Sequence, residues 1–301
     1  GGYMKLFLVY NARAGHRNAA RRLHEVTSYL KKKNTDYTLA VTEYPGHAAE
    51  LIRTLTSSTY DGIIAAGGDG TLFETVNGYF ENPSLSAEKI PVGILPLGTG
   101  NAVARDLGLT KKEWKKSIDL FFSGNVKYID TGFCTCSDKS FYFVNIVGLG
   151  FVAAVTKTAH LLKLFGNASY TMGVLWQTLK LPLQTVTLTV DGIKYVRENL
   201  FIEVSNTRYT SNFLMAPAAR IDDGLLDITL ANKLTRKRLI KILPKSYTGD
   251  HIHYREVETL TGKKIRIEAS RNNILTPDGE LTGTTPVTIE CLKGALPVFW
   301  T

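Results

Sequence analysis

A short apolar run that passes through glycines into a helix is the feature that most constrains this fold. Residues 62–66 read Gly-Ile-Ile-Ala-Ala, which is typical of a buried strand, and they continue into Gly67-Gly68-Asp69-Gly70-Thr71 and a helical pattern over residues 72–79. Glycines at such a junction let a bulky anion approach the backbone, while the start of the helix supplies unpaired N–H groups and partial positive charge. The stretch predicts a phosphate-binding loop. A glycine-rich turn without a ligand is the alternative on these residues alone.

Asp69 is an unusual residue for such a loop. A carboxylate beside phosphate oxygens repels them unless a divalent cation or a hydrogen-bond donor lies between the two groups. We therefore expect Mg²⁺ near Asp69.

A second loop of the same kind follows a second predicted strand. Residues 91–95 are strand-like and deliver Pro96-Leu97-Gly98-Thr99-Gly100-Asn101 just before a helix that runs through Ala104 and Leu107. Two such loops at one edge of a parallel sheet would form opposite walls of one crevice, which is where open α/β sheets bind ligands. The pair therefore favours a nucleotide as the ligand.

The order of predicted elements divides the chain into two domains. Strands over residues 5–10, 36–42, 63–66 and 91–95 alternate with helices over 18–33 and 48–55, which predicts a doubly wound α/β domain over residues 1–130. Residues 131–301 are mostly strands and predict an antiparallel β-sandwich, whose C-terminal end could pack back on the first domain. Its expected strands cover residues 141–147, 186–190, 200–204, 225–230, 264–268 and 287–290, with helical insertions at about 151–164 and 171–180.

Composition restricts the partners and the location. The net charge of +9 indicates an anionic partner, but nucleic acid is disfavoured because the chain has no zinc-finger spacing, no aromatic RNA-binding signature and no long basic tail. No apolar run approaches the roughly 18 residues of a membrane span, and the start lacks a signal sequence, so we expect a cytoplasmic protein. Three cysteines give neither a disulfide framework nor zinc spacing.

The two glycine loops and a late Asp278-Gly279-Glu280, in this order and at these spacings, resemble the diacylglycerol kinase catalytic family. This family includes bacterial soluble lipid kinases and the eukaryotic sphingosine and ceramide kinases. The resemblance extends from Asn11 to the C-terminal strands. It implies an ATP- and Mg²⁺-dependent kinase that phosphorylates a lipid hydroxyl while it is peripherally and transiently bound to the membrane surface. A homodimer is one oligomeric state open to such a protein.

The resemblance also assigns site residues. The catalytic residues would be Glu280 as the base that accepts the hydroxyl proton, with Asp278 as the close alternative, and Asp69. A structural Mg²⁺ would be held by the Asp223 carboxylate and by the main-chain carbonyls of Arg220 and Leu225. The nucleotide would contact Asn11, Ala12, Arg13, Ala14, Gly15, Thr42, Gly67, Gly68, Asp69, Gly70, Thr71, Leu72, Phe73, Glu74, Gly98, Thr99 and Asn101.

Three departures from the family pattern leave the lipid open. Ala12 replaces a proline, Phe73 stands where many bacterial members have asparagine, and Ala102 replaces the aspartate that commonly follows Asn101. A sphingoid base or another lipid is therefore an alternative substrate. An NAD kinase and a non-catalytic nucleotide-binding protein are the remaining alternatives. The dipeptides Asp222-Asp223 and Asp278-Gly279 could also be ordinary turns.

Overall fold

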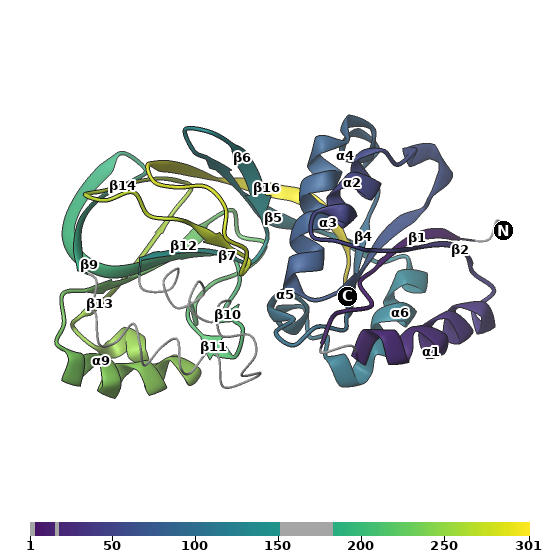
Figure 1. The fold of residues 1–301 in the computed structure, drawn as a ribbon, viewed down its shortest axis with the longest axis horizontal. Coiled ribbons are helices and arrows are strands. Elements are labelled where there is room, and N and C mark those ends of the chain that lie inside the picture. The colour runs from purple at the N-terminus through teal and green to yellow at the C-terminus, as the bar shows by residue number, and fades with distance from the viewer. Residues whose placement is uncertain (1–3, 16–17, 151–182) are drawn as a thin grey trace. The chain divides into compact units, whose positions relative to one another are not determined.

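The computed structural model describes residues 4–15, 18–150 and 183–301 (Figure 1). The chain forms two compact units. Unit 1 comprises Gly1–Thr131 and Lys293–Thr301, and unit 2 comprises Gly132–Leu292. Strands β5 (Val126–Thr135) and β16 (Val287–Phe299) each contribute residues to both units.

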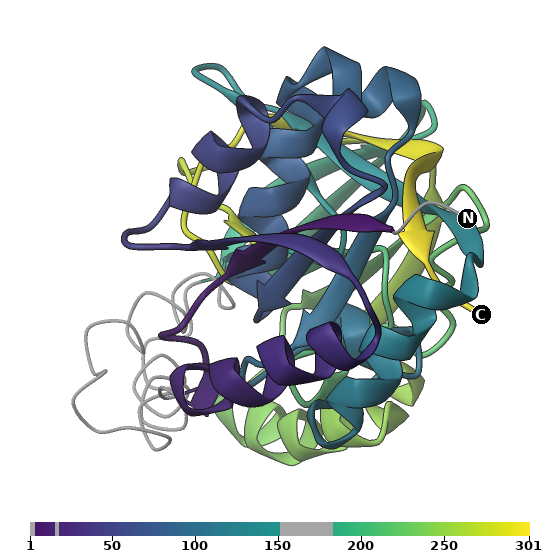
Figure 2. The ribbon, with the colours of Figure 1, turned by 90° about the vertical axis from the view of Figure 1, so that its right-hand side faces the viewer.

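Unit 1 is a parallel sheet covered by helices on both faces, as Figure 2 shows. The strand order is β4-β3-β1-β2, and Val298 of β16 pairs with Val92 at the β4 edge. Its strands are β1 (Lys5–Tyr10), β2 (Asp36–Val41), β3 (Gly62–Gly67) and β4 (Val92–Pro96). Its helices are α1 (Asn18–Lys32), α2 (His47–Arg53), α3 (Asp69–Glu81), α4 (Pro83–Glu88), α5 (Ala102–Asp106) and α6 (Trp114–Ser123), with 3₁₀ turns at Ser57–Thr59 and Lys111–Glu113.

Apolar alternation in the strands builds the core of unit 1. Leu6, Leu8 and Tyr10 all point to the face covered by α1 and α6, where they pack with Val26 of α1 and Phe121 of α6. Strand β3 is buried along its whole length, as expected for a central strand of a parallel sheet. The carboxyl ends of all four strands therefore lie along one edge, and the loops that follow them share that edge.

Unit 2 is an antiparallel β-sandwich. Strand β9 (Ile193–Ser205) pairs with β8 (Gln184–Val190) through its first half and with β12 (Leu226–Asn232) and β7 (Ile146–Gly150) through its second half. The other strands are β6 (Ser140–Phe143), β10 (Tyr209–Thr210), β11 (Phe213–Leu214), β13 (Val257–Gly262), β14 (Lys264–Ala269) and β15 (Thr276–Pro277). Its described helical segments are α9 (Arg236–Ile242), η4 (Leu243–Tyr247) and η5 (Asp250–His253).

The predicted fold class, an α/β domain joined to a β-sandwich, is confirmed. One expected strand was wrong: residues 141–147 form two strands, β6 and β7, separated by Val144 and Asn145. The helical insertions expected at 151–164 and 171–180 lie outside the described residues. Among the residues that are described, no helix is both long and apolar enough to cross a bilayer.

A buried carboxyl group in unit 2 makes its stability depend on pH. Burial raises the pKa of Glu203 from 4.5 to about 7, although Thr210 and Ser205 donate hydrogen bonds to it. Because the folded state holds this proton more tightly than the unfolded state, the contribution of Glu203 to stability is fully present below pH 4.5 and is lost as the pH rises through 7.

We therefore expect Glu203→Gln to flatten the dependence of the melting temperature on pH between about 4.5 and 7. Glu203 alone should account for a loss of about 3 kcal/mol of unfolding free energy across this window, at about 1.4 kcal/mol per pKa unit. Glu198→Gln, at a 58% exposed side chain on the same strand, is the matched control and should keep the parent profile. Parallel profiles for Glu203→Gln and the parent would refute this assignment.

Candidate active site

Four loops follow the strands of unit 1 at the carboxyl edge of its sheet. The loop after β3 leads into α3, and the loop after β4 leads into α5. The Asn11–Gly15 loop follows β1, and Thr42 follows β2, where its N–H donates to the carbonyl of Tyr10 at 2.9 Å. All the nucleotide-site residues predicted from the sequence therefore lie along one edge of one sheet.

The two glycine loops are in direct backbone contact. The N–H groups of Leu97 and Gly98 both donate to the carbonyl of Gly67, at 2.8 and 3.0 Å. A Cβ atom added at Gly98 would lie only 2.4 Å from the Cα of Gly68, and one added at Gly68 would lie 3.2 Å from the Cα of Gly98. A side chain at position 98 would collide with backbone, and one at position 68 would require a shift of a few tenths of an ångström, so the steric need for glycine is strong at Gly98 and weaker at Gly68.

The Asp69 carboxylate joins the two loops. It occupies the first turn of α3, and its Oδ1 accepts a hydrogen bond from the N–H of Ala102, the first residue of α5, at 2.8 Å. Burial raises the pKa of Asp69, while the backbone N–H groups of Ala102, Val103 and Asn101 act in the opposite direction. The hydrogen-bond donors that this buried carboxylate requires are thus the N–H groups at the N-terminus of α5. The sequence did not reveal this contact.

The second loop is also held by its own side chain. Asn101 has a left-handed backbone (φ 51°) at the N-cap of α5, and its Oδ1 accepts from the N–H of Gly98 at 3.0 Å while its Nδ2 donates to the carbonyl of Gly98 at 2.8 Å. Thr99, between them, is exposed. The loop is therefore rigid on its inner side and presents Thr99 to solvent.

The loop after β1 is tied to the glycine loop. The Nδ2 of Asn11 donates to the Oγ1 of Thr71 at 3.1 Å, and the Oδ1 of Asn11 accepts from the N–H of Arg13 at 3.0 Å. At the other end of the loop, an added Cβ at Gly15 would lie 2.9 Å from the Nζ of Lys111. The ammonium group of Lys111 therefore lies beside the loop. The sequence did not point to Lys111, because this residue follows α5 and is far along the chain from the loop.

Glu74 has a structural contact that its predicted role did not anticipate. Its two carboxylate oxygens accept hydrogen bonds from the N–H groups of Gly46 and Ala48, at 2.7 and 3.1 Å. These groups belong to the first turn of α2, where the N-cap Gly46 has no side chain of its own to satisfy them. Glu74 thereby links α3 to the loop that contains Thr42.

The predicted metal-binding residues lie in unit 2, in the loop before β12. The Oδ1 of Asp223 accepts from the N–H of Leu225 at 3.0 Å, and Arg220 forms an ion pair with Asp222 at 3.7 Å. Burial and the negative charge of Asp223 raise the pKa of Asp227 to about 6. The charge of Asp223 therefore acts on Asp227, which the sequence pattern did not single out, although no three His, Cys, Asp or Glu side chains of the described residues cluster as metal ligands.

Asp278 is a buried anchor of unit 2. Its backbone is left-handed (φ 48°), and its carboxylate accepts from the N–H groups of Val144, Asn145 and Ile146 at 3.4, 3.1 and 2.8 Å. These N–H groups lie at the break between β6 and β7. They donate to the Asp278 carboxylate instead of to the carbonyl groups of a neighbouring strand. Asp278 thus explains why the expected strand over residues 141–147 is interrupted.

Glu280 differs from Asp278 in its surroundings. It is exposed, and its N–H donates to the carbonyl of Pro277 at 2.8 Å, which closes the tight turn after β15. The two carboxylates that the sequence left as alternatives are therefore distinct: one is fixed in the interior by backbone N–H groups, and the other is accessible at a turn.

Two glycine loops at the carboxyl edge of a doubly wound sheet, followed along the chain by a β-sandwich, place the candidate site where open α/β sheets bind ligands. Two family models divide this chain between them. The diacylglycerol kinase catalytic domain matches residues 5–134, and the YegS C-terminal NAD kinase β-sandwich-like domain matches residues 145–300.

Relatives match over nearly the whole length. A diacylglycerol kinase from Mycobacterium tuberculosis is 28% identical, over 98% of this chain and 94% of the relative, and one from Bacillus subtilis is 26% identical, over 93% and 90%. A solved structure from Bacillus anthracis, described as a diacylglycerol kinase candidate, has a TM-score of 0.81 at 25% identity and covers 100% of this chain and 96% of its own. The chain belongs to the family of two-domain proteins that carry this catalytic domain and this β-sandwich domain, and the names of its homologues support a kinase.

Proposed function

We propose that this protein is a lipid kinase that transfers the γ-phosphoryl group of ATP, with Mg²⁺, to a hydroxyl of diacylglycerol or a similar lipid. The observation that carries the proposal is the contact between the two glycine loops, bridged by Asp69 to the N-terminus of α5. Family membership supports the same reaction class. We place the protein in the cytoplasm, transiently bound to the membrane surface where its substrate resides.

Backbone and side-chain groups of unit 1 would have different roles in binding the nucleotide. In our proposal the loops after β3 and β4 receive the phosphates, with the N–H groups at the start of α3 as donors, because a helix N-terminus carries unpaired N–H groups and partial positive charge. Lys111 adds a positive charge near the loop after β1. Phosphoryl transfer depends mainly on positioning and on stabilising charge, which these groups could supply.

The proton of the lipid hydroxyl needs an accepting group. We assign this task to Glu280, because it is exposed and its carboxylate can approach a substrate. Asp278 is less suited, because backbone N–H groups already hold its carboxylate in the interior. The exposure of Glu280 and the burial of Asp278 thus support the choice between the two residues.

A phosphoryl-transfer screen tests the function. The parent protein would be incubated with γ-labelled ATP and Mg²⁺ and, in separate reactions, diacylglycerol, monoacylglycerol, phosphatidylglycerol, sphingosine, ceramide or NAD. Labelling of diacylglycerol above all others is the expected result. Labelling of sphingosine or NAD would move the assignment to those kinases, and nucleotide binding without transfer to any acceptor would refute the kinase proposal.

A structural Mg²⁺ in unit 2 is a separate part of the proposal. The proposal is supported by the chemistry of the predicted ligands, since a carboxylate and main-chain carbonyls are the oxygen donors that a hard cation prefers. Asp223 would hold the ion with the carbonyls of Arg220 and Leu225. When bound, Mg²⁺ would neutralise the Asp223 carboxylate.

We expect Asp223→Asn to abolish the difference in melting temperature between Mg²⁺ and chelator. An ion that binds only the folded state stabilises it by about 2.7 kcal/mol at a hundred times its dissociation constant. Asp222→Asn, at the neighbouring exposed carboxylate, is the control and should keep the difference. If the parent melts at the same temperature in Mg²⁺ and in chelator, this ion site does not exist.

A further inference from the structure

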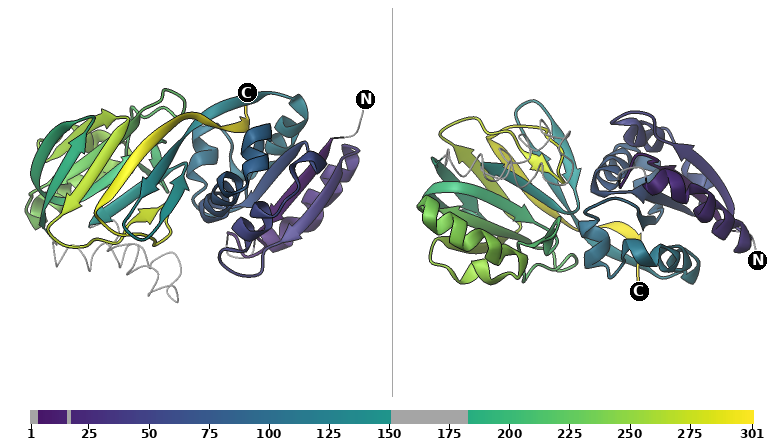
Figure 3. Two further views of the ribbon diagram at one scale, coloured as in Figure 1. Left: turned by 90° about the horizontal axis from the view of Figure 1, so that it is seen from above. Right: turned by 60° about the horizontal axis from the view of Figure 1, so that its bottom comes forward.

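A helical segment of unit 2 exposes apolar and basic side chains together. Helix α9 and the 3₁₀ helix η4 run without a break over residues 236–247. Leu239 and Ile242 are buried and fix the segment to the sandwich, whereas Ile240 and Tyr247 are 62% and 56% exposed. Figure 1 and the right-hand view of Figure 3 show this green segment on one side of the strands of unit 2.

Basic side chains surround the two exposed apolar residues. Arg236, Lys237, Lys241 and Lys245 are all exposed, and Asp250 is the exposed acidic residue that follows in the chain. Ile240 lies in the α-helical part of the segment and Tyr247 in its 3₁₀ part, where the Tyr247 ring also packs against Phe213 with 4.4 Å between the ring centroids. We call Arg236, Lys237, Ile240, Lys241, Lys245 and Tyr247 the α9 surface.

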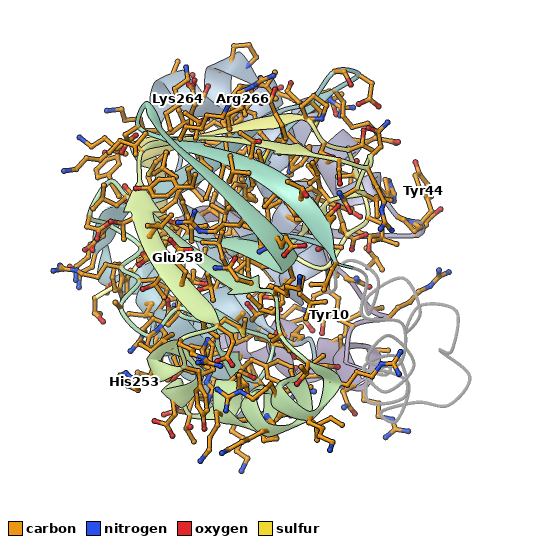
Figure 4. The ribbon with its side chains drawn as sticks, turned by 90° about the vertical axis from the view of Figure 1, so that its left-hand side faces the viewer. Tyr10, Tyr44, His253, Glu258, Lys264 and Arg266 are labelled. Carbon is orange, nitrogen blue, oxygen red and sulfur yellow. The ribbon has the colours of Figure 1, made fainter. Side chains whose placement is uncertain are left out.

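Neighbouring cations outside the α9 surface are neutralised by acids. Lys233 pairs with Glu198 at 2.9 Å and Arg238 pairs with Glu256 at 2.7 Å. A hollow of about 480 Å³ beside α9 is lined by these paired residues. Among the described residues, the four basic side chains of the α9 surface form no ion pair. Their charge is therefore available to an external anion. His253 and Glu258, labelled in Figure 4, mark the η5 turn and the strand β13 that follow the segment.

We infer that the α9 surface docks this protein on anionic phospholipid bilayers. A short helical segment with exposed isoleucine and tyrosine among lysines and arginines matches a bilayer interface, where the apolar side chains enter the headgroup boundary and the cations meet anionic headgroups. Tyrosine suits this layer because its ring is apolar and its hydroxyl stays hydrated. The inference rests on the proposed function, in that the lipid substrate lies in a membrane.

Two double variants separate the two contributions. Lys237→Glu with Lys241→Glu removes positive charge, and Ile240→Ser with Tyr247→Ser removes apolar contact while keeping the charge. Lys31→Glu with Lys32→Glu, at exposed lysines in the last turn of α1, is the matched control because it changes the net charge by the same amount. Binding is measured by co-sedimentation with phosphatidylcholine vesicles that contain or lack phosphatidylglycerol.

The parent should bind vesicles that contain phosphatidylglycerol and bind pure phosphatidylcholine vesicles weakly. Each cation near an anionic surface strengthens binding about fivefold, so Lys237→Glu with Lys241→Glu should weaken it at least about 25-fold. Ile240→Ser with Tyr247→Ser should weaken it about tenfold, since each apolar side chain contributes by its buried area. The α1 control should lose much less.

Three results would overturn the inference. The first is that the parent binds neither kind of vesicle, and the second is that the α1 control loses as much binding as the α9 charge variant. The third is unchanged binding in both α9 variants, which would mean that another surface contacts the membrane or that the α9 surface binds a protein partner.

An activity readout separates this inference from the kinase proposal. With a short-chain diacylglycerol dissolved as monomers, both α9 variants should turn over at the parent rate, while their turnover on vesicles falls in step with binding. A parent that binds vesicles through the α9 surface but phosphorylates neither lipid would refute the kinase and leave the docking surface standing.

Discussion

Glu280→Gln should lower lipid phosphorylation by about 10²–10⁴-fold, the usual contribution of a general base, with little change in nucleotide affinity. Glutamine keeps the shape of the side chain and its hydrogen-bonding capacity but cannot accept the proton of the attacking hydroxyl. Because glutamine keeps the size and polarity of this exposed side chain, the melting temperature should change little. Steady-state turnover, affinity for a non-hydrolysable ATP analogue and thermal unfolding are the three measurements.

Asp278→Asn provides the contrast. Its carboxylate accepts hydrogen bonds from three consecutive N–H groups, and an amide retains one acceptor oxygen. Loss of charged hydrogen bonds to buried donors should cost about 1–3 kcal/mol of unfolding free energy. Stability should therefore fall in Asp278→Asn and turnover in Glu280→Gln. Loss of turnover confined to Asp278→Asn, at parental stability, would reverse the assignment. If turnover falls only a few-fold in both variants, Asp278-Gly279-Glu280 is a turn without a catalytic role.

Gly98→Ala should reduce turnover by about 10²-fold through displacement of the two loops. The added methyl would meet the Cα of Gly68 at 2.4 Å, a distance that backbone atoms cannot accommodate without moving. Displacements near 1 Å in positioning groups cost about this factor. Calorimetry with the ATP analogue should show weaker binding as well, because the loop backbone would no longer meet the phosphates.

Gly68→Ala is the milder variant to compare with Gly98→Ala. Its methyl would meet the Cα of Gly98 at 3.2 Å, so a shift of a few tenths of an ångström relieves the contact and the loss should be smaller than in Gly98→Ala. Thermal unfolding of both variants checks that the fold persists. Parental affinity in both variants would mean that phosphates bind away from these loops, whereas equal losses would mean that the distance between the loops is not the cause.

The layout of unit 1 was accessible from the sequence because its signals are local. The apolar run of β3 ends at the glycines, and strand β1 was predicted with its observed bounds at Lys5 and Tyr10. The contacts of the loops were not accessible. The hydrogen bond between Asp69 and Ala102 joins residues 33 positions apart, and no periodicity encodes it.

Unit 2 was harder to predict for the same reason. Strand β16 was expected over residues 287–290 but continues to Phe299 through Gly294 and Pro297, residues that ordinarily weaken a strand. The break between β6 and β7 is set by Asp278, more than 130 positions later in the chain. Helix α9 was not predicted, because its seven residues are too few for a helical period to stand out in the sequence.

The assignment of Lys293–Thr301 to unit 1 has a consequence for biosynthesis. Phe299 is 3% exposed in the core that also contains Leu6 and Phe121, and Val298 completes the β4 edge of the sheet. The ribosome makes residues 1–131 first, and the core of unit 1 lacks the Phe299 side chain until residue 299 has left the exit tunnel. A fragment that stops at residue 131 would therefore leave exposed the apolar side chains of unit 1 that Phe299 covers.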